Sequence, residues 1–333
     1  MAHLDLTDRF GRVVRDLRIS VTDRCNFRCT YCMDEEMTWL PRSGVLTFEE
    51  FERLARLMVE RFGVEGIRLT GGEPTIRHNL AVLVAKLAAL RTEAGPIDVA
   101  MTTNGATMRS LAPKLRAAGL RRVNISLDTL DRQRFAAMTR RDELPKVLDG
   151  IDAACAAGFD PVKINAVVMR GTNDDEIVDL ATFGRERGIE VRFIEWMPLD
   201  AGGGWDRGEV VGQDEIVARI DAVYPLEQLA ARGAAPADRW RYVDGGGTVG
   251  VIPSVTKPFC GDCDRVRLTA DGQFRTCLFA TDEADLRAAL RSGESDDQLA
   301  ARIQQAVAGK WAGHHINQVD FVRPARSMSQ IGG

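Results

Sequence analysis

The sequence predicts an α/β protein, with a partial (β/α)6 TIM-like barrel followed by a C-terminal α+β domain. Six short segments rich in Val, Ile and Leu are typical of buried parallel strands. Amphipathic helical patterns separate these segments, and repeated βα units imply a parallel sheet. Six units are too few for the usual eight-unit barrel, so a partial, open barrel is expected. The expected strands are residues 17–21, 66–70, 97–102, 122–127, 162–168 and 190–196.

Helix signals lie between the expected strands. Thr47 and Glu50 have the spacing of a capping box, which predicts a helix start. An apolar stripe over residues 48–57 continues that helix. Similar stripes over residues 80–87 and 177–183 predict two further helices.

The chain is expected to divide into two domains, residues 1–200 and residues 201–333. The second domain is rich in turns, and residues 323–333 show no periodicity. Its expected elements are a helix near 213–223, a hairpin of 240–243 and 248–252, loop and short strand over 260–277, and helices near 283–291 and 296–308.

Composition excludes several classes of protein. Lys and Arg total 44 and Asp and Glu total 48 among 333 residues, which argues against a dedicated nucleic-acid binder. No apolar run is long enough to span a membrane, and the N-terminal residues lack the apolar core of a signal peptide. A cytoplasmic location is therefore expected, with cysteines as thiols or metal ligands rather than disulfides.

Six of the seven cysteines fall into two groups of three. The first group is a C-x3-C-x2-C run just after the first expected strand, and the second is a C-x2-C pair with a third cysteine further on. Thiolates bind soft metals, and close spacing lets one loop surround one site. A four-iron cluster held by three cysteines keeps one iron open for chemistry. The groups are Cys25, Cys29 and Cys32, and Cys260, Cys263 and Cys277.

A pair of structural zinc sites is the alternative. Zinc usually takes four ligands in a closed site, and neither group has a fourth Cys or His nearby. The four histidines are not at finger spacing, and His314 and His315 are expected at the surface or a helix end. Cys155 lies in an apolar helical stretch and is expected to be a small buried core residue. Two four-iron clusters explain the count better, although zinc completed by distant residues stays open.

The cysteine run, with Tyr31 before its last cysteine, resembles the signature of the radical S-adenosylmethionine superfamily. The run Thr70-Gly71-Gly72-Glu73-Pro74 is similar to the turn that meets the methionine amino group in that family. Paired glycines let the backbone approach a ligand closely. The resemblance implies that the open iron of the first 4Fe-4S cluster is chelated by S-adenosylmethionine. The reduced cluster then cleaves this cofactor and releases a 5′-deoxyadenosyl radical.

Longer stretches resemble one family of this superfamily, the GTP 3′,8-cyclases of molybdenum cofactor biosynthesis. The similarity covers almost the whole chain and is weakest over residues 201–242. It implies a lyase that converts GTP to (8S)-3′,8-cyclo-7,8-dihydroguanosine 5′-triphosphate with two 4Fe-4S clusters. The stretches that carry it are residues 17–26, 102–105, 124–128, 260–268 and 331–333.

Cationic side chains inside or beside expected strands point to an anionic ligand. A charge in a barrel strand is costly to bury unless it is paired. Arg265 and Arg267 alternate, so they share one face of a strand. Each cation could pair with a nearby Asp or Glu, but a shared phosphate ligand explains the set better. The set is Arg18, Arg68, Lys163, Arg265 and Arg267, and the resemblance adds Thr102 and Val266 as GTP contacts.

Further roles follow from the resemblance alone. It implies that the radical removes the 3′ hydrogen of the GTP ribose, and that the resulting carbon radical adds to C8 of guanine. The second cluster would bind the guanine. The positions matching S-adenosylmethionine contacts are Tyr31, Gly72, Ser126 and Met197, for which core packing or strand-end hydrogen bonding is the ordinary alternative.

The tail is the last feature that the resemblance explains. Gly332 and Gly333 are expected to enter the barrel and act in catalysis together with the first three cysteines, Arg265 and Arg267. Glycines can enter a narrow cavity because they have no side chain. Arg323 or Arg326 is expected to anchor the base of the tail. The alternative is a terminal segment with no role.

Partners are implied in the same way. The product would pass to a cyclic pyranopterin monophosphate synthase, a flavodoxin or ferredoxin would supply electrons, and a homodimer stays open. Two other interpretations remain. One is another two-cluster radical enzyme, such as a peptide-modifying one, although such enzymes tend to carry more cysteines in the C-terminal domain. The other is a non-enzymatic zinc-binding module.

Overall fold

Six parallel strands form the centre of the fold in the computed structural model, which describes residues 4–199, 203–319 and 321–332. They pair in the order in which they occur along the chain. Each matches an expected strand to within one residue at either end, and the predicted α/β partial barrel is confirmed. The strands are β1 (Asp16–Ser20), β2 (Gly66–Thr70), β5 (Asp98–Thr103), β6 (Arg122–Ser126), β7 (Val162–Val168) and β8 (Glu190–Glu195).

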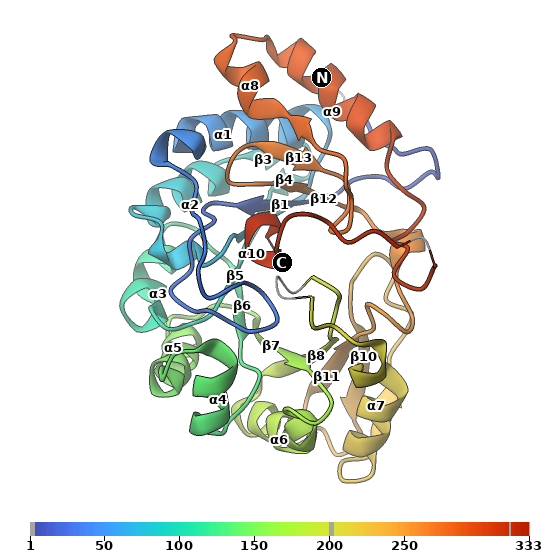
Figure 1. Cartoon of the computed structure of the whole chain (residues 1–333). Helices are drawn as coiled ribbons and strands as arrows, with labels where there is room; N and C mark the ends of the chain where they lie inside the picture. Colours follow the sequence, from blue (N-terminus) through green and yellow to red (C-terminus); the bar gives the residue numbers. More distant parts are fainter. Residues whose placement is uncertain (1–3, 200–202, 320, 333) are drawn as a thin grey trace.

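Helices cover the outer side of the curved sheet (Figure 1). The first begins at the predicted capping box, where the Thr47 side chain accepts from the Glu50 amide. A minor hairpin, β3 (Arg91–Thr92) with β4 (Gly95–Pro96), follows the second helix. The helices are α1 (Phe48–Arg56), α2 (Leu80–Ala88), α3 (Met108–Ala117), α4 (Arg132–Thr139), α5 (Leu144–Ala156) and α6 (Ile177–Arg187).

The C-terminal part of the chain extends the same sheet at both edges. At one edge β11 (Thr248–Ile252) pairs in parallel with β8, followed outward by β10 (Asp238–Tyr242) and β9 (Leu226–Gln228). At the other edge β12 (Arg265–Leu268) pairs in parallel with β1, followed by β13 (Gln273–Arg275) and β14 (Ala284–Asp285). The expected hairpin and the expected short-strand region of residues 260–277 therefore become sheet edges. The expected domain boundary at 200–201 lies outside the described residues.

The expected helices of this C-terminal part are α7 (Gln213–Asp221), α8 (Leu286–Arg291) and α9 (Asp296–Ala308). The helix α8 begins later than expected because residues 284–285 join the sheet. The tail is not wholly irregular: Met328–Ile331 forms the short helix α10, which returns to the middle of the molecule (Figure 1).

The prediction for Cys155 was wrong, because this residue is exposed on α5. The buried face of α5 is formed by other positions, among them Val147, Ile151 and Ala154. None of the helices in the described ranges has the length and apolar character needed to cross a membrane.

Candidate active site

The inner face of the curved sheet lines a cavity of about 480 Å³, within the range of small-molecule sites. Side chains alternate between the two faces of a strand. In β1 this alternation points Asp16 and Arg18 toward the cavity and buries Leu17 and Ile19 in the core. Both groups of three cysteines line this same cavity.

The first cysteine triad, Cys25, Cys29 and Cys32, lies on the loop after β1. Burial raises the pKa of Cys25 to about 11 and that of Cys32 to about 12, and it raises the pKa of Cys29 well above its ordinary value. The carboxylates of Glu73 and Asp128 add to these shifts. Such thiols stay protonated at neutral pH unless a metal displaces the proton. A soft, thiolate-binding group such as an iron–sulfur cluster therefore fits this donor set.

The two glycines after β2 pack directly on the loop that leads to the first triad. A Cβ on Gly71 would overlap the Thr22 carbonyl, and one on Gly72 would overlap the Arg24 carbonyl. Their backbone is held by hydrogen bonds from Gly72 N to Thr22 O, 2.9 Å, and from the next amide to Arg24 O, 2.8 Å. Glycine is thus required here by close backbone approach.

Glu73, in the same turn, has its carboxylate fully engaged by the protein. It is 1% exposed and accepts hydrogen bonds from Thr75 N, 3.0 Å, Thr103 Oγ1, 2.7 Å, and Asn104 N, 2.6 Å. The Asn104 side chain continues the link by donating to Asn26 Oδ1, 2.8 Å, beside Cys25. The ends of β2 and β5 are therefore tied to the cysteine loop.

Asp128, just beyond β6, connects the first triad to the next wall of the cavity. Its carboxylate accepts from the Tyr31 hydroxyl, 2.6 Å, and from Val167 N, 2.8 Å. Burial raises the pKa of Asp128 to about 6, although these two hydrogen bonds oppose the shift. Sequence analysis did not select Asp128 as a site residue.

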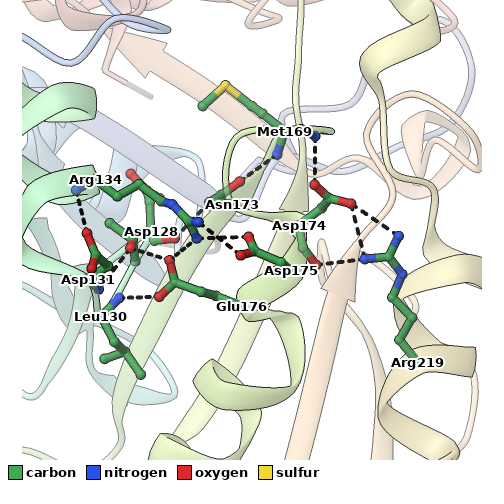
Figure 2. A network of polar contacts seen from close by, with 12 residues as sticks. Asp128, Leu130, Asp131, Arg134, Met169, Asn173, Asp174, Asp175, Glu176 and Arg219 are labelled. Atoms are coloured by element: carbon green, nitrogen blue, oxygen red, sulfur yellow. Dashed lines mark hydrogen bonds and ion pairs between the residues drawn. The ribbon is translucent and has the colours of Figure 1, made fainter.

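A polar network behind Asp128 fixes the loops that follow β6 and β7 (Figure 2). Asn173 donates to the Asp128 carbonyl, 2.7 Å, and to the Val167 carbonyl, 2.8 Å. Glu176 accepts from Leu130 N, 2.7 Å, and pairs with Arg134. The loop carrying Asp128 is consequently held from two sides.

The second triad is assembled from two segments of the chain. Cys260 and Cys263 flank a tight turn before β12, and Cys277 follows β13. The antiparallel pairing of β12 and β13 brings Cys277 back toward the other two. Arg12 holds the first segment by donating to the Cys260 carbonyl, 2.5 Å, and to the Ala312 carbonyl, 2.8 Å.

Cations surround the second triad. Burial raises the pKa of Cys263, but Arg265 and Lys310 outweigh it, so the net pKa is lowered. Lys310 is 2% exposed, and its Nζ lies 3.9 Å from Cys263 Sγ. Thiolate is therefore electrostatically stabilised at Cys263, whereas burial raises the pKa of Cys260 and of Cys277. A soft anionic metal cluster fits a site with these thiols and cations.

A single metal ion fits neither triad. Across the described part of the chain, no three His, Cys, Asp or Glu side chains are gathered closely enough to bind one ion. A four-iron cluster is wider than one ion, so its cysteine ligands stand further apart. His314 is not a surface residue: it lines the cavity, and its Nε2 lies 2.8 Å from the Ser254 carbonyl.

Four predicted arginines meet on one wall of the cavity, Arg18, Arg68, Arg265 and Arg267. Parallel pairing of β1 and β12 places Arg18 directly beside Arg267. Burial lowers the pKa of Arg18 and of Arg68 to about 10. Within the described residues, Arg18 Nε and Arg68 Nη1 are buried without a hydrogen-bond partner. Buried donors of this kind require an acceptor, and an anionic ligand supplies it.

Other predicted contacts are distributed unevenly. Lys163 does not line the cavity, because its Nζ is paired with Glu190, 2.9 Å. Val266 is fully buried and points away from the cavity, between Arg265 and Arg267. The positions that do line it are Tyr31, Gly72, Thr102, Ser126 and Met197.

Sequence analysis missed two cavity arginines, Arg122 in β6 and Arg192 in β8. Each occupies an inward position of an expected strand, so the alternation that selected Arg265 could have found them. Arg192 also donates to Glu190, 2.7 Å, which links it to Lys163.

The C-terminal tail runs into the cavity wall. Met328 and Ser329 line the cavity, and Arg267 donates to the Gly332 carbonyl. Gly332 has φ +71°, and a Cβ there would overlap the side chains of Ser20 and Thr70. Arg326 anchors the base of the tail on Asp271, 2.9 Å. Gly333 lies outside the described residues.

Two family models match the chain, the Radical SAM superfamily over residues 19–184 and Molybdenum Cofactor Synthesis C over residues 189–316. A GTP 3′,8-cyclase of Streptomyces coelicolor is 52% identical, with 100% of this chain and 97% of the relative covered. One of Corynebacterium glutamicum is 51% identical over 98% of this chain and 89% of the relative. The chain belongs to the GTP 3′,8-cyclase family.

Solved structures agree with this family in fold. SuiB of Streptococcus suis bound to S-adenosylmethionine has a TM-score of 0.63 at 14% identity, covering 94% of this chain and 77% of SuiB. Native anSMEcpe with bound AdoMet has a TM-score of 0.59 at 16% identity, covering 88% and 81%. As a radical S-adenosylmethionine protein, the chain uses S-adenosylmethionine and a 4Fe-4S cluster.

Proposed function

We propose that the protein converts GTP to (8S)-3′,8-cyclo-7,8-dihydroguanosine 5′-triphosphate by radical chemistry. The observation that supports this most strongly is the meeting of two cysteine triads and four arginines, two of them buried, in one cavity. A nucleotide triphosphate offers the anionic oxygens that Arg18 Nε and Arg68 Nη1 lack.

In this proposal Cys25, Cys29 and Cys32 hold the first 4Fe-4S cluster, which when bound supplies the electron that cleaves S-adenosylmethionine. The glycine turn after β2 presents backbone groups to the methionine end of the cofactor. The proposed cofactor contacts are Tyr31, Gly72, Ser126 and Met197.

Cys260, Cys263 and Cys277 are proposed to hold a second 4Fe-4S cluster at the guanine end of GTP. Arg265 and Arg267 then orient the nucleotide from β12, with Arg18 beside them. Lys163 acts through Glu190 and Arg192 rather than by direct reach. The remaining proposed GTP contacts are Arg68, Thr102 and Val266, the last through its backbone.

The tail is proposed to complete the site, with Gly332 and Gly333 as catalytic elements. Arg267 contacts both the cavity and the tail, so binding of the nucleotide and position of the tail are coupled through one side chain. We also propose two domains, residues 1–200 and 201–333, a flavodoxin or ferredoxin as electron donor, and transfer of the product to a cyclic pyranopterin monophosphate synthase.

Anaerobic incubation tests the reaction directly. The reconstituted protein is mixed with S-adenosylmethionine, a reductant and each nucleoside triphosphate in turn, and products are identified by mass spectrometry. Of the nucleoside triphosphates, only GTP should yield an isomer of its own unchanged mass, together with 5′-deoxyadenosine. Modification of a peptide substrate with no turnover of GTP would refute the proposal.

Two arginine variants test the position of the nucleotide. Arg265→Ala and Arg267→Ala should each weaken GTP binding by about 1.5–3 kcal/mol, the value of a charge-assisted hydrogen bond. Both should still cleave S-adenosylmethionine slowly. Unchanged GTP affinity in both variants, measured by equilibrium binding, would place the triphosphate elsewhere.

A further inference from the structure

Lys310 is a buried cation beside the second triad that the proposed reaction does not use. It follows α9, is 2% exposed, and donates from Nζ to the Cys263 carbonyl, 2.8 Å, and the Arg265 carbonyl, 3.0 Å. Its Nζ also lies 3.9 Å from Cys263 Sγ. One ammonium group therefore contacts both the cysteine segment and the strand that carries the cavity arginines.

Within the described residues, the charge of Lys310 has no carboxylate in direct contact, and Asp8 and Asp264 act on it from beyond contact distance. Among the described residues, no Asp or Glu lies within 4.0 Å of its Nζ, and nearby Asp8 is paired with Arg12 at 2.6 Å. Lys163 differs in this respect, because its ammonium is 2.9 Å from Glu190. A buried charge without a counter-charge is strongly destabilising. The anionic group within reach of Lys310 is the ligand sphere of the second triad.

The surroundings of the first triad have the opposite sign. Asp128 and Glu73 are buried carboxylates beside it, whereas Arg28, the cation that donates to the Cys25 carbonyl, is only partly buried. Net charge near a cluster and hydrogen bonds around its sulfurs set its reduction potential, since added positive charge stabilises the reduced, more negative form.

We propose that Lys310 is a positioning residue that holds the Cys263 segment and raises the reduction potential of the second cluster above that of the first. This inference rests on the second cluster proposed above. The consequence is that the two clusters are reduced in a fixed order, because an external reductant reduces the cluster of higher potential first.

The experiment is an anaerobic redox titration followed by electron paramagnetic resonance. Replacing Cys25, Cys29 and Cys32 by Ala leaves the second cluster as the observed species, and replacing the other triad isolates the first. With Lys310 unchanged, the second cluster should have a higher midpoint potential than the first. Lys310→Met should lower the midpoint of the second cluster by at least about 59 mV, a tenfold change for a one-electron couple. It should leave the first cluster unchanged.

Two matched variants separate charge from structure. Lys310→Arg keeps the charge and should keep most of the potential, whereas Lys114→Met removes an exposed lysine and should change neither cluster. A Lys310→Met protein with full iron and sulfide and an unshifted second midpoint would overturn the inference. If that variant fails to bind iron, the wild-type comparison decides, and a second cluster at or below the potential of the first overturns it.

Iron counts distinguish a failure of the role proposed for Lys310 from a failure of the proposed second cluster. Wild-type protein with about eight irons and equal potentials contradicts the role of Lys310 alone. Wild-type protein with about four irons, all lost with the first triad, contradicts the second cluster itself.

Discussion

Each of the two cysteine triads presents three thiols to the same cavity, but the charged groups beside the two triads differ. The first lies on a single loop beside Asp128 and Glu73, and burial and carboxylates raise the pKa values of its thiols. The second is built from two segments among cations, and Arg265 and Lys310 lower the pKa of Cys263, although burial raises the pKa of Cys260 and of Cys277.

This difference teaches that ligand type and local charge are set by different parts of the chain. The cysteines come from the loop after β1 and from the two ends of the β12–β13 hairpin, whereas the charges come from β12, from the segment after α9 and from the ends of β2 and β6. Two sites with the same donors can therefore serve different steps of one reaction.

The largest expected effect comes from deleting each triad. Replacing Cys25, Cys29 and Cys32 by Ala should abolish cleavage of S-adenosylmethionine and leave about four irons per chain. Replacing Cys260, Cys263 and Cys277 should retain slow cleavage while abolishing formation of the cyclised nucleotide. Iron, sulfide and 5′-deoxyadenosine are measured in each protein. If both deletions had the same effect on cleavage, the assignment of separate roles would be wrong.

Gly332, which packs on Ser20 and Thr70 and accepts a hydrogen bond from Arg267, offers the next test. In Gly332→Ala the Cβ meets Ser20 and Thr70 and the left-handed φ of +71° is strained, so cyclisation should fall about a hundredfold. Iron content and GTP binding should remain. The control is Gly158→Ala, where φ is +75° and no atom lies within 4 Å of the added Cβ. Equal rates in both variants would show that the contacts of Gly332 with Ser20 and Thr70 are not needed for cyclisation.

The sequence predicted the central strands well because buried parallel strands are continuous apolar runs. It also grouped the cysteines as the structure does, because C-x3-C-x2-C and C-x2-C runs have few other uses, although only the pairing of β12 with β13 shows how Cys277 reaches the other two. It could not predict that β12 pairs with β1, because strand register depends on tertiary packing. That pairing is what places Arg267 beside Arg18.

Other misses have identifiable causes. Lys310 near a helix end is typical of an exposed residue, and only its contacts with the Cys263 segment show that it is buried. Cys155 was misassigned because its alanine neighbours hide which face of α5 is buried. The helix α10 could have been found, because Ser327 and Gln330 form a capping box.

A Glu190 variant tests whether this carboxylate balances the charges of Lys163 and Arg192. Lys163 and Arg192 contribute to lowering its pKa to about 2 against the opposing effect of burial, from an ordinary value of 4.5. Its ionised form is favoured in the fold, so this stabilisation is present above pH 4.5 and is lost as pH falls toward 2. Wild type should lose about 3 kcal/mol more than Glu190→Gln across that window. Urea unfolding of the metal-free proteins measures the free energy of unfolding at each pH. If this free energy had the same pH dependence in both proteins, the pairing of Glu190 would be contradicted.

The smallest expected effect is at Asp128, the carboxylate beside the first triad. Its pKa of about 6 leaves it ionised at pH 8, where its negative charge disfavours the added electron on a reduced cluster. Asp128→Asn should therefore raise the midpoint potential of the first cluster by less than about 59 mV, the shift that corresponds to a tenfold change in a one-electron equilibrium. The midpoint potential of the second cluster should not change. Tyr31→Phe is the matched control, because it removes the 2.6 Å hydrogen bond and keeps the charge. An equal rise in both variants would assign the effect to the hydrogen bond, and a fall in Asp128→Asn would reverse the electrostatic contrast between the triads.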